Sequence, residues 1–173
     1  MIPVYLQRGV LHSCLGDDLA SAAQALGQGK LPQAGQFLLH EQRQPRPYLY
    51  ADVSADHLDQ RLERLLDELL DADARELDDC LLIIASTSLD ITELESRASA
   101  EQVFCPEHST PLDLLAERLR QRRGFADAFT LNTACTSAAN GLLYGARLLA
   151  AGAYQRVVVL AFETPSALAM QGF

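Results

Sequence analysis

The stretch "LNTACTSAANGLLYGARLL", residues 131–149, joins a strand-like run to a helix and decides the fold. The run "FADAFTLNTA" (125–134) has the apolar content of a strand, and small residues dominate the helical stretch 136–152. A second apolar run, "RVVVLAF" (156–162), follows that helix and indicates a buried strand. A strand, a helix and a strand in this order predict two parallel strands linked by a crossover helix.

The same alternation extends toward the N-terminus. "DCLLIIAS" (79–86) is a continuous apolar run, which is typical of a strand covered on both faces. Leucines recur at helical spacing from Leu58 to Leu70, opposite a charged face, and predict a surface helix. Further helices are expected at residues 17–29, 92–98 and 109–124. The order predicts an α/β fold in which helices enclose a mixed, mainly parallel sheet.

Side-chain oxygens that can accept backbone N–H groups mark the helix starts. The N-cap candidates are Asp17 or Asp18 for the helix at 17–29, and Ser109 or Thr110 for the helix at 109–124. Gly27 or Gly29 is expected to end the first helix, and Gly124 the second.

Three segments fit the alternation less well. Residues 3–11 are strand-like, and the proline-containing region 31–53 holds two candidate strands, "FLLH" (37–40) and "YLYADV" (48–53). The final "ALAMQGF" (167–173) follows a core strand without a recognisable covering helix. Such an ending leaves apolar strand surface uncovered, so we expect this sequence to be part of a domain rather than a whole one.

Composition narrows the class of protein. A chain of 173 residues suits one compact domain by length, and 49% hydrophobic residues can form a substantial core. The net charge of −9 disfavours nucleic acid or an anionic membrane as the main partner. No apolar stretch reaches the ~18 residues of a membrane span. The N-terminus also lacks the pattern of a signal peptide, so a cytoplasmic protein is expected.

The four cysteines do not form a disulfide framework or a clear metal site. They are far apart in the sequence, at Cys14, Cys80, Cys105 and Cys135. Cys105 and His108, in "CPEH", are spaced like a pair of zinc ligands, but no second pair accompanies them. We therefore predict no bound metal.

Cys135 is the candidate nucleophile, because it lies where a strand gives way to a helix. The unpaired N–H groups and the dipole of a helix N-terminus stabilise a thiolate. A sharp strand-to-helix turn also exposes its side chain, and small neighbouring residues leave room for a substrate. The alternative is a small apolar residue buried at the helix start, since cysteine is among the most buried residue types.

The stretch "TACTSAANGLLYGARLLAAGAYQRVVVLAFE" resembles the active-site segment of β-ketoacyl-acyl-carrier-protein synthases, the condensing enzymes of fatty acid and polyketide synthesis. Cys135 matches the acyl-accepting cysteine of that family. The residues in register around it are Thr133, Ala134, Thr136 and Ser137. The segments "GVLHSCLGDDLASAAQALGQGK", "VFCPEHSTPLDLLAERLRQRRG" and the final "QGF" resemble the family in the same order. The resemblance implies that residues 1–173 are the N-terminal half of a thiolase-like fold.

The resemblance also implies an activity and its partners. Cys135 would accept an acyl group from acyl carrier protein, which bears a phosphopantetheine arm, and condense it with malonyl-carrier protein. It implies a homodimer, paired through residues 129–132, or a ketosynthase heterodimer, with no cofactor or metal of the enzyme's own. The family's catalytic histidines and lysine lie in the second half of the domain. The histidines of this chain, His12, His40, His57 and His108, all precede Cys135 and match none of them.

This sequence departs from the family pattern in three places. "ASTSLD" (85–90) replaces glycines that border the acyl pocket, so the resemblance implies substrate contact at Ser88 and Leu89, and at Thr136 beside the nucleophile. Ala161 and Phe162 replace a Gly-Gly pair, and "ADA" (126–128) replaces Gly-Pro-Ser. These differences suggest a divergent branch, for which the synthesis of specialised polyenes or polyketides is one alternative and fatty acid synthesis the other.

Two other functions stay open on the sequence. One is a catalytically silent subunit that pairs with an active ketosynthase and shapes chain length, although such partners typically lack the cysteine. The other is acyl transfer without condensation.

Lys30 follows a helix-ending glycine and is expected to be exposed, and His57 is expected on a solvated helix surface.

Overall fold

A computed structural model describes residues 2–30, 35–37, 46–49, 58–70, 77–101 and 111–172 of the chain. The chain divides into two compact units. One comprises Met1–Tyr5 with Asp73–Phe173, and the other comprises Leu6–Ala72. The larger unit holds the central sheet and the candidate site.

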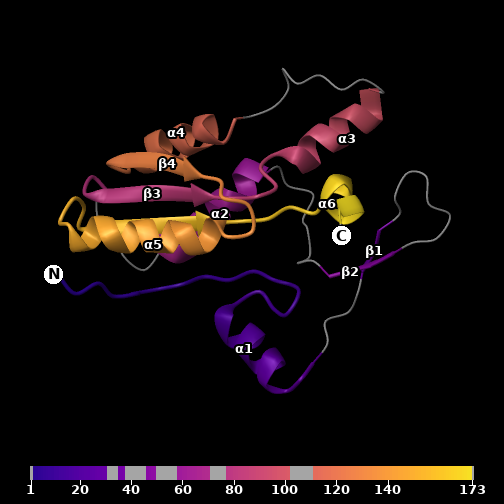
Figure 1. The fold of residues 1–173 in the computed structure, drawn as a ribbon, viewed down its shortest axis with the longest axis horizontal. Helices are drawn as coiled ribbons and strands as arrows, with labels where there is room; N and C mark the ends of the chain where they lie inside the picture. Colours follow the sequence, from indigo (N-terminus) through magenta and orange to yellow (C-terminus); the bar gives the residue numbers. More distant parts are fainter. Residues whose placement is uncertain are drawn as a thin grey trace. The chain divides into compact units, whose positions relative to one another are not determined.

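The core of the larger unit is a three-stranded sheet of the order β4-β3-β5. β3 (Cys80–Ala85), β4 (Asp127–Leu131) and β5 (Arg156–Ala161) are parallel, and their arrows point the same way in Figure 1. All six residues of β3 are buried. The continuous apolar run of this strand had predicted a strand covered on both faces, and that prediction is confirmed.

Two helices between the strands in the sequence pack on the sheet. α4 (Leu112–Arg123) precedes β4, and α5 (Ser137–Ala150) links β4 to β5 and lies along β5 in Figure 1. The chain passes from β3 to one side for β4 and then back across β3 to β5. Because crossovers between parallel strands are right-handed, this reversal places the two helices on opposite faces of the sheet. The predicted enclosure of a parallel sheet by helices is confirmed.

α5 lies unusually close to the sheet because two of its buried residues are glycines. A Cβ atom at Gly141 would come within 3.0 Å of Val159 Cγ1, and one at Gly145 within 2.9 Å of Val157 Cγ1. Val157 and Val159 are β-branched, so these methyl groups stand close to the backbone and cannot turn away freely. The two glycines therefore set the distance between α5 and β5.

Replacing Gly145 with valine should destabilise the fold by about 1–3 kcal/mol, because overpacking forces the helix and strand apart. Urea unfolding, followed by circular dichroism, measures the change. Gly27→Ala is the matched control, since no heavy atom lies within 4 Å of a Cβ at that position in another helix. Equal stability of Gly145→Val and the native protein would contradict the close packing.

The two ends of α4 differ from one another. Its N-cap is Pro111, so the prediction of Ser109 or Thr110 as the N-cap is wrong, and both of these residues lie outside the described ones. The carbonyl of Pro111 accepts the N–H groups of Leu114 and Leu115. The C-terminal end follows the prediction. Gly124 adopts a left-handed conformation with φ of 76°, and its N–H donates to Arg120.

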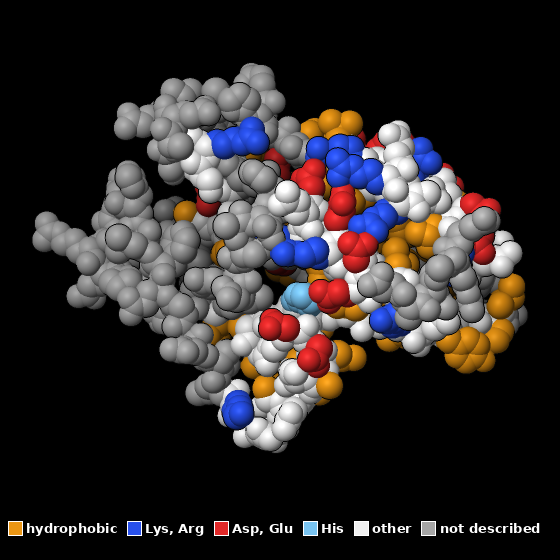
Figure 2. Space-filling model, turned by 180° about the vertical axis from the view of Figure 1, so that it is seen from behind, with side chains coloured by type: hydrophobic (Ala, Val, Ile, Leu, Met, Phe, Trp, Pro, Cys, Tyr) orange, Lys and Arg blue, Asp and Glu red, His pale blue; other side chains and the backbone are white. Residues whose placement is uncertain are grey.

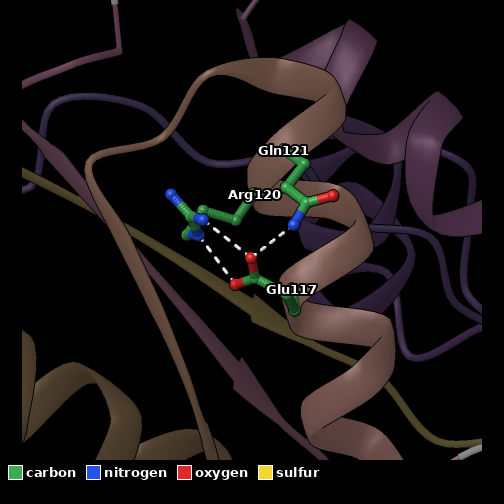
Figure 3. A network of polar contacts seen from close by, with 3 residues as sticks. All are labelled: Glu117, Arg120 and Gln121. Atoms are coloured by element: carbon green, nitrogen blue, oxygen red, sulfur yellow. Dashed lines mark hydrogen bonds and ion pairs between the residues drawn. The ribbon is translucent and has the colours of Figure 1, made fainter.

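A polar network stabilises the exposed side of α4 (Figure 3). Arg120 Nε and a terminal guanidinium nitrogen each donate to the Glu117 carboxylate at 2.7 Å, as does the Gln121 amide. The hydrogen bonds from Arg120 and then Gln121 lower the pKa of Glu117 from 4.5 to about 2. The carboxylate therefore stays ionised in acid that protonates ordinary glutamates.

Acid should remove the stabilisation that this network provides. Because the pKa of Glu117 is depressed in the folded protein, the stabilisation is present above pH 4.5 and is lost as the pH falls through about 2. Glu117→Gln should therefore be less stable than the native protein at neutral pH, and the difference should shrink toward pH 2. Urea unfolding of both proteins across this range measures it; a difference that is independent of pH would contradict the assignment.

The amino ends of the strands are tied together by side chains. Arg156 Nε donates to Asp79 Oδ1 at 2.9 Å, and the same guanidinium forms an ion pair with that carboxylate. This hydrogen bond raises the pKa of Arg156. The hydroxyl of Tyr154 donates to Asp127 Oδ2 at 2.7 Å, which raises the pKa of the phenol. These bonds join the start of β5 to the starts of β3 and β4.

Two further helices follow the strands. α3 (Ile91–Glu101) includes the helix expected at 92–98 and is longer than predicted. α6 (Ala167–Gly172) lies where no helix was expected, and that expectation is wrong. The carboxylate of Glu95 accepts the N–H groups of Ala167 and Leu168, at 2.7 and 2.8 Å. These bonds cap α6 from another part of the chain, which a local pattern does not show.

The smaller unit holds α1 (Leu19–Gly27) and α2 (Leu58–Leu70), both predicted from leucine spacing or end signals. Asp18, rather than Asp17, is the N-cap of α1: its carboxylate accepts the N–H of Ser21 at 2.7 Å, and this bond lowers its pKa. Lys30 is exposed, as expected. A short antiparallel pair, β1 (Gly35–Phe37) and β2 (Arg46–Tyr48), completes the described elements.

The strand predicted at residues 3–11 is absent: these residues belong to no strand or helix. A strand needs a hydrogen-bonded neighbour, and none of the described strands pairs with them. The candidate strands "FLLH" and "YLYADV" overlap β1 and β2 only at Phe37 and Tyr48. Leu49 is not in a strand, and the rest of both stretches lies outside the described residues.

Candidate functional site

The candidate site lies at the carboxyl edge of the parallel sheet, where three loops follow three strands. Residues 86–90 follow β3, residues 132–136 follow β4, and residues 162–166 follow β5. The connection from β3 to β4 includes α4 on one face, and the connection from β4 to β5 is α5 on the other. Ligands of open parallel sheets bind where neighbouring connections diverge in this way. Cys135 lies in the loop after β4.

A tight turn places Cys135 just before α5. Ala134 has a φ of 53°, a left-handed conformation that is uncommon for a residue with a side chain. Its carbonyl accepts the N–H of Ser137 at 2.9 Å and the hydroxyl of Ser137 at 2.7 Å. The hydroxyl of Ser137 in turn accepts the N–H of Thr133 at 2.9 Å. The hydrogen bonds of buried Ser137 therefore hold the turn together, while Cys135 is exposed.

The predicted substrate residue Thr136 is the N-cap of α5, and its side chain is used within the turn. Its hydroxyl donates to the carbonyl of Thr133 at 2.7 Å, and Asn140 Nδ2 donates to that hydroxyl at 3.2 Å. Asn140 also donates to Thr133 Oγ1 at 2.8 Å. A polar surface of exposed Thr133 and Thr136 and half-buried Asn140 therefore adjoins Cys135.

The other predicted substrate residues, Ser88 and Leu89, lie in the loop after β3. The hydroxyl of Ser88 accepts the N–H of Thr164 at 2.9 Å, so Ser88 links the loops after β3 and β5. Leu89 is half-buried with a φ of 53°, and its N–H donates to Ser86 Oγ at 3.0 Å. These hydrogen bonds join neither residue directly to the turn of Cys135.

Thr87 provides the link between the loop after β3 and the turn of Cys135. Its hydroxyl donates to the carbonyl of Ala134 at 2.8 Å. The carboxylate of Glu163 accepts the N–H groups of Thr87 and Ser88, at 2.6 and 2.8 Å. The sequence patterns did not single out Thr87 or Glu163. The available signal was their position directly after parallel strands, whose carboxyl ends share one edge.

The histidines give Cys135 no partner within the described residues. His12 Nε2 lies 2.9 Å from Glu68 Oε2, in the unit formed by Leu6–Ala72. His40, His57 and His108 lie outside the described residues, as does Cys105. No described hydrogen bond joins a histidine to the turn of Cys135, and no group of three metal-ligating side chains occurs among the described residues.

The described cysteines differ sharply in their environments. Cys80 is buried in β3, and this burial raises the pKa of its thiol from 9.0 to about 11. Cys14 is half-buried, and Cys135 is exposed. A nucleophilic thiol must reach its substrate and ionise, so Cys135 meets the first requirement and Cys80 meets neither. Cys135 is thus exposed in this structure, rather than buried as the alternative interpretation of an apolar residue at the helix start expects.

Figure 2 shows the charged side chains on one face of the molecule. On the face shown in Figure 2, the basic side chains of the coloured residues are interspersed with acidic ones. The net charge of −9 also disfavours the binding of polyanions. None of the described helices combines the length and the apolar character that crossing a bilayer requires.

Comparison with known proteins adds no relative. No protein-family model matches the chain, and no match is found among curated proteins. The site itself presents an exposed thiol in a strained turn, next to the start of a helix, at the carboxyl edge of a parallel sheet.

Iodoacetamide should alkylate Cys135 in the native protein at least about 10-fold faster than Cys80, because alkylation requires an accessible thiolate. Peptide mapping by mass spectrometry after timed quenching measures both rates. In urea, the two rates should converge, which controls for peptide recovery. Equal rates in the folded protein would contradict the burial and raised pKa of Cys80.

Proposed function

We propose that this chain is the N-terminal half of a β-ketoacyl-acyl-carrier-protein synthase of thiolase-like fold, with Cys135 as the acyl-accepting nucleophile. The observation that carries the proposal is the exposed Cys135 in a left-handed turn between a parallel strand and α5. A sharp strand-to-helix turn of this kind presents a nucleophile to its substrate. The resemblance of "TACTS" and its flanking segments to the ketosynthase pattern supplies the reaction class.

The proposed chemistry has two steps. The thiolate of Cys135 attacks the carbonyl carbon of an acyl thioester on acyl carrier protein. The bond from that carbon to the phosphopantetheine sulfur breaks, and the sulfur leaves as a thiolate, which takes up a proton from solvent. Malonyl-carrier protein then loses carbon dioxide. The resulting carbanion attacks the acyl-Cys135 thioester, which forms a carbon–carbon bond and releases the thiolate of Cys135.

The outer face of α5 also supports a thiolase-like fold. Three large apolar side chains of this helix are exposed to solvent: Leu142, Leu143 and Tyr144 are 54%, 46% and 48% exposed. Large apolar side chains grouped on one helix are typical of a surface covered by another layer. In the layered thiolase-like architecture, the second half of the domain would cover this helix and bring the histidines and lysine that assist decarboxylation.

Two edges of the site are available for partners. Among the described strands, β4 pairs only with β3, so its outer edge can pair with the same strand of a second copy or of a related subunit. This supports the proposed homodimer through residues 129–132 and leaves a ketosynthase heterodimer as the alternative. Acyl carrier protein would approach the carboxyl edge, where Ser88, Leu89 and Thr136 are proposed to border the acyl chain.

Cys135→Ala should abolish transfer of an acyl group from acyl-loaded carrier protein to the protein as its source produces it. Intact-mass spectrometry detects the acyl-enzyme, and peptide mapping locates it. Cys14→Ala is the matched control and should acylate normally, because Cys14 lies in the other unit. Unchanged acylation of Cys135→Ala would overturn the assignment.

The product of a second incubation, with malonyl-carrier protein, separates the remaining alternatives. A β-ketoacyl product supports the condensing enzyme. An acyl-enzyme that passes its acyl group on without condensation indicates a transferase. A native protein that never forms the acyl-enzyme indicates a silent partner subunit.

A further inference from the structure

Resting on the proposed role of Cys135 as nucleophile, we propose that Thr87 and Glu163 are positioning residues for it. Glu163 holds Thr87, and Thr87 holds the carbonyl of Ala134, the residue directly before Cys135. Neither side chain needs to touch the substrate. Together they connect the loops after β3, β4 and β5 into one support for the nucleophile.

The turn needs such support because its conformation is strained. A left-handed conformation is unfavourable for a residue with a Cβ, and it persists only where the surroundings hold it. Ala134 has this conformation, with a φ of 53°. Its relaxation would rotate the peptide that joins Ala134 to Cys135 and would move the thiol relative to the start of α5.

Three donors converge on the carbonyl oxygen of Ala134. Two come from Ser137, through its N–H at 2.9 Å and its hydroxyl at 2.7 Å. Ser137 belongs to α5, so these bonds tie the turn only to its own helix. The third donor is the hydroxyl of Thr87 at 2.8 Å, which ties the turn to the neighbouring strand β3. Thr87 therefore fixes the turn relative to the sheet.

Glu163 fixes Thr87 in turn. One carboxylate oxygen accepts the N–H of Thr87 at 2.6 Å, and the other accepts the N–H of Ser88 at 2.8 Å. Hydrogen bonds from backbone N–H groups to a carboxylate are among the stronger ones in proteins. An amide at this position could accept only one of the two N–H groups, so Glu163→Gln separates the two-point hold from mere side-chain size.

The test measures acyl transfer to Cys135 in Thr87→Val, Thr87→Ser and Glu163→Gln, using an acyl-loaded carrier protein and the native full-length chain. Thr87→Val should lower the rate constant at saturating carrier protein by about 10- to 100-fold, because a misplaced reacting group loses proximity. Its half-saturation concentration should stay within about threefold. Thr87→Ser keeps the hydroxyl and should have a rate constant close to that of the native protein. Glu163→Gln should lower the rate constant, as Thr87→Val does. Native rates in Thr87→Val would overturn the proposal.

Tyr154→Phe is the matched control. It also removes one 2.7 Å hydrogen bond from the same sheet, but at the amino ends of the strands, and should leave acyl transfer unchanged. If Thr87→Val fails to fold, Glu163→Gln decides in the same assay. If Tyr154→Phe slows acyl transfer as much as Thr87→Val does, the effect comes from a general loss of stability, and the positioning role is overturned.

Amide hydrogen exchange keeps this proposal separate from the proposed function. If the native protein accepts no acyl group, the ketosynthase assignment fails, but the N–H of Ser137 still reports the turn through its bond to Ala134. Its exchange should accelerate about 10-fold in Thr87→Val and remain native in Thr87→Ser. Unchanged exchange in Thr87→Val would overturn the positioning role whatever Cys135 does.

Discussion

The parallel pairing of β3 with β4 on one side and β5 on the other is the constraint on which the larger unit depends. Leu82 pairs in register with Ala128 and with Val158, so the three strands run side by side over their length. Because the strands are parallel, all three end at the same edge, and the loops that follow them meet there. Residues 87, 134 and 163 are far apart in the sequence, and this pairing brings their loops close enough to form the hydrogen bonds that join them.

The two edges of the sheet have different chemistry. The amino edge is joined by the bonds of Arg156 to Asp79 and of Tyr154 to Asp127, which tie strand ends together and leave no exposed nucleophile among the residues described there. The carboxyl edge holds two residues in the left-handed conformation, Leu89 and Ala134, and an exposed thiol between strand and helix. Strain of this kind gathers at functional sites, because a rigid scaffold holds what a free loop would release.

Much of the fold was predictable because its signals are local. The buried run of β3, the leucine spacing of α2 and the left-handed Gly124 after α4 each depend on residues close in sequence. The failures depend on distant partners. Residues 3–11 have strand-like composition, but no described strand pairs with them. α6 is capped by Glu95, which lies in α3, far from α6 in the sequence.

The candidate site divides in the same way. The sequence by itself determined that Cys135 follows a strand and precedes a helix, because period and residue size are properties of neighbours along the chain. Its exposure, the strain at Ala134 and the support from Thr87 and Glu163 were decided only by the tertiary structure. The physical reason is that a hydrogen bond joins atoms that are close in space, and only the pairing of three parallel strands brings these loops within its reach.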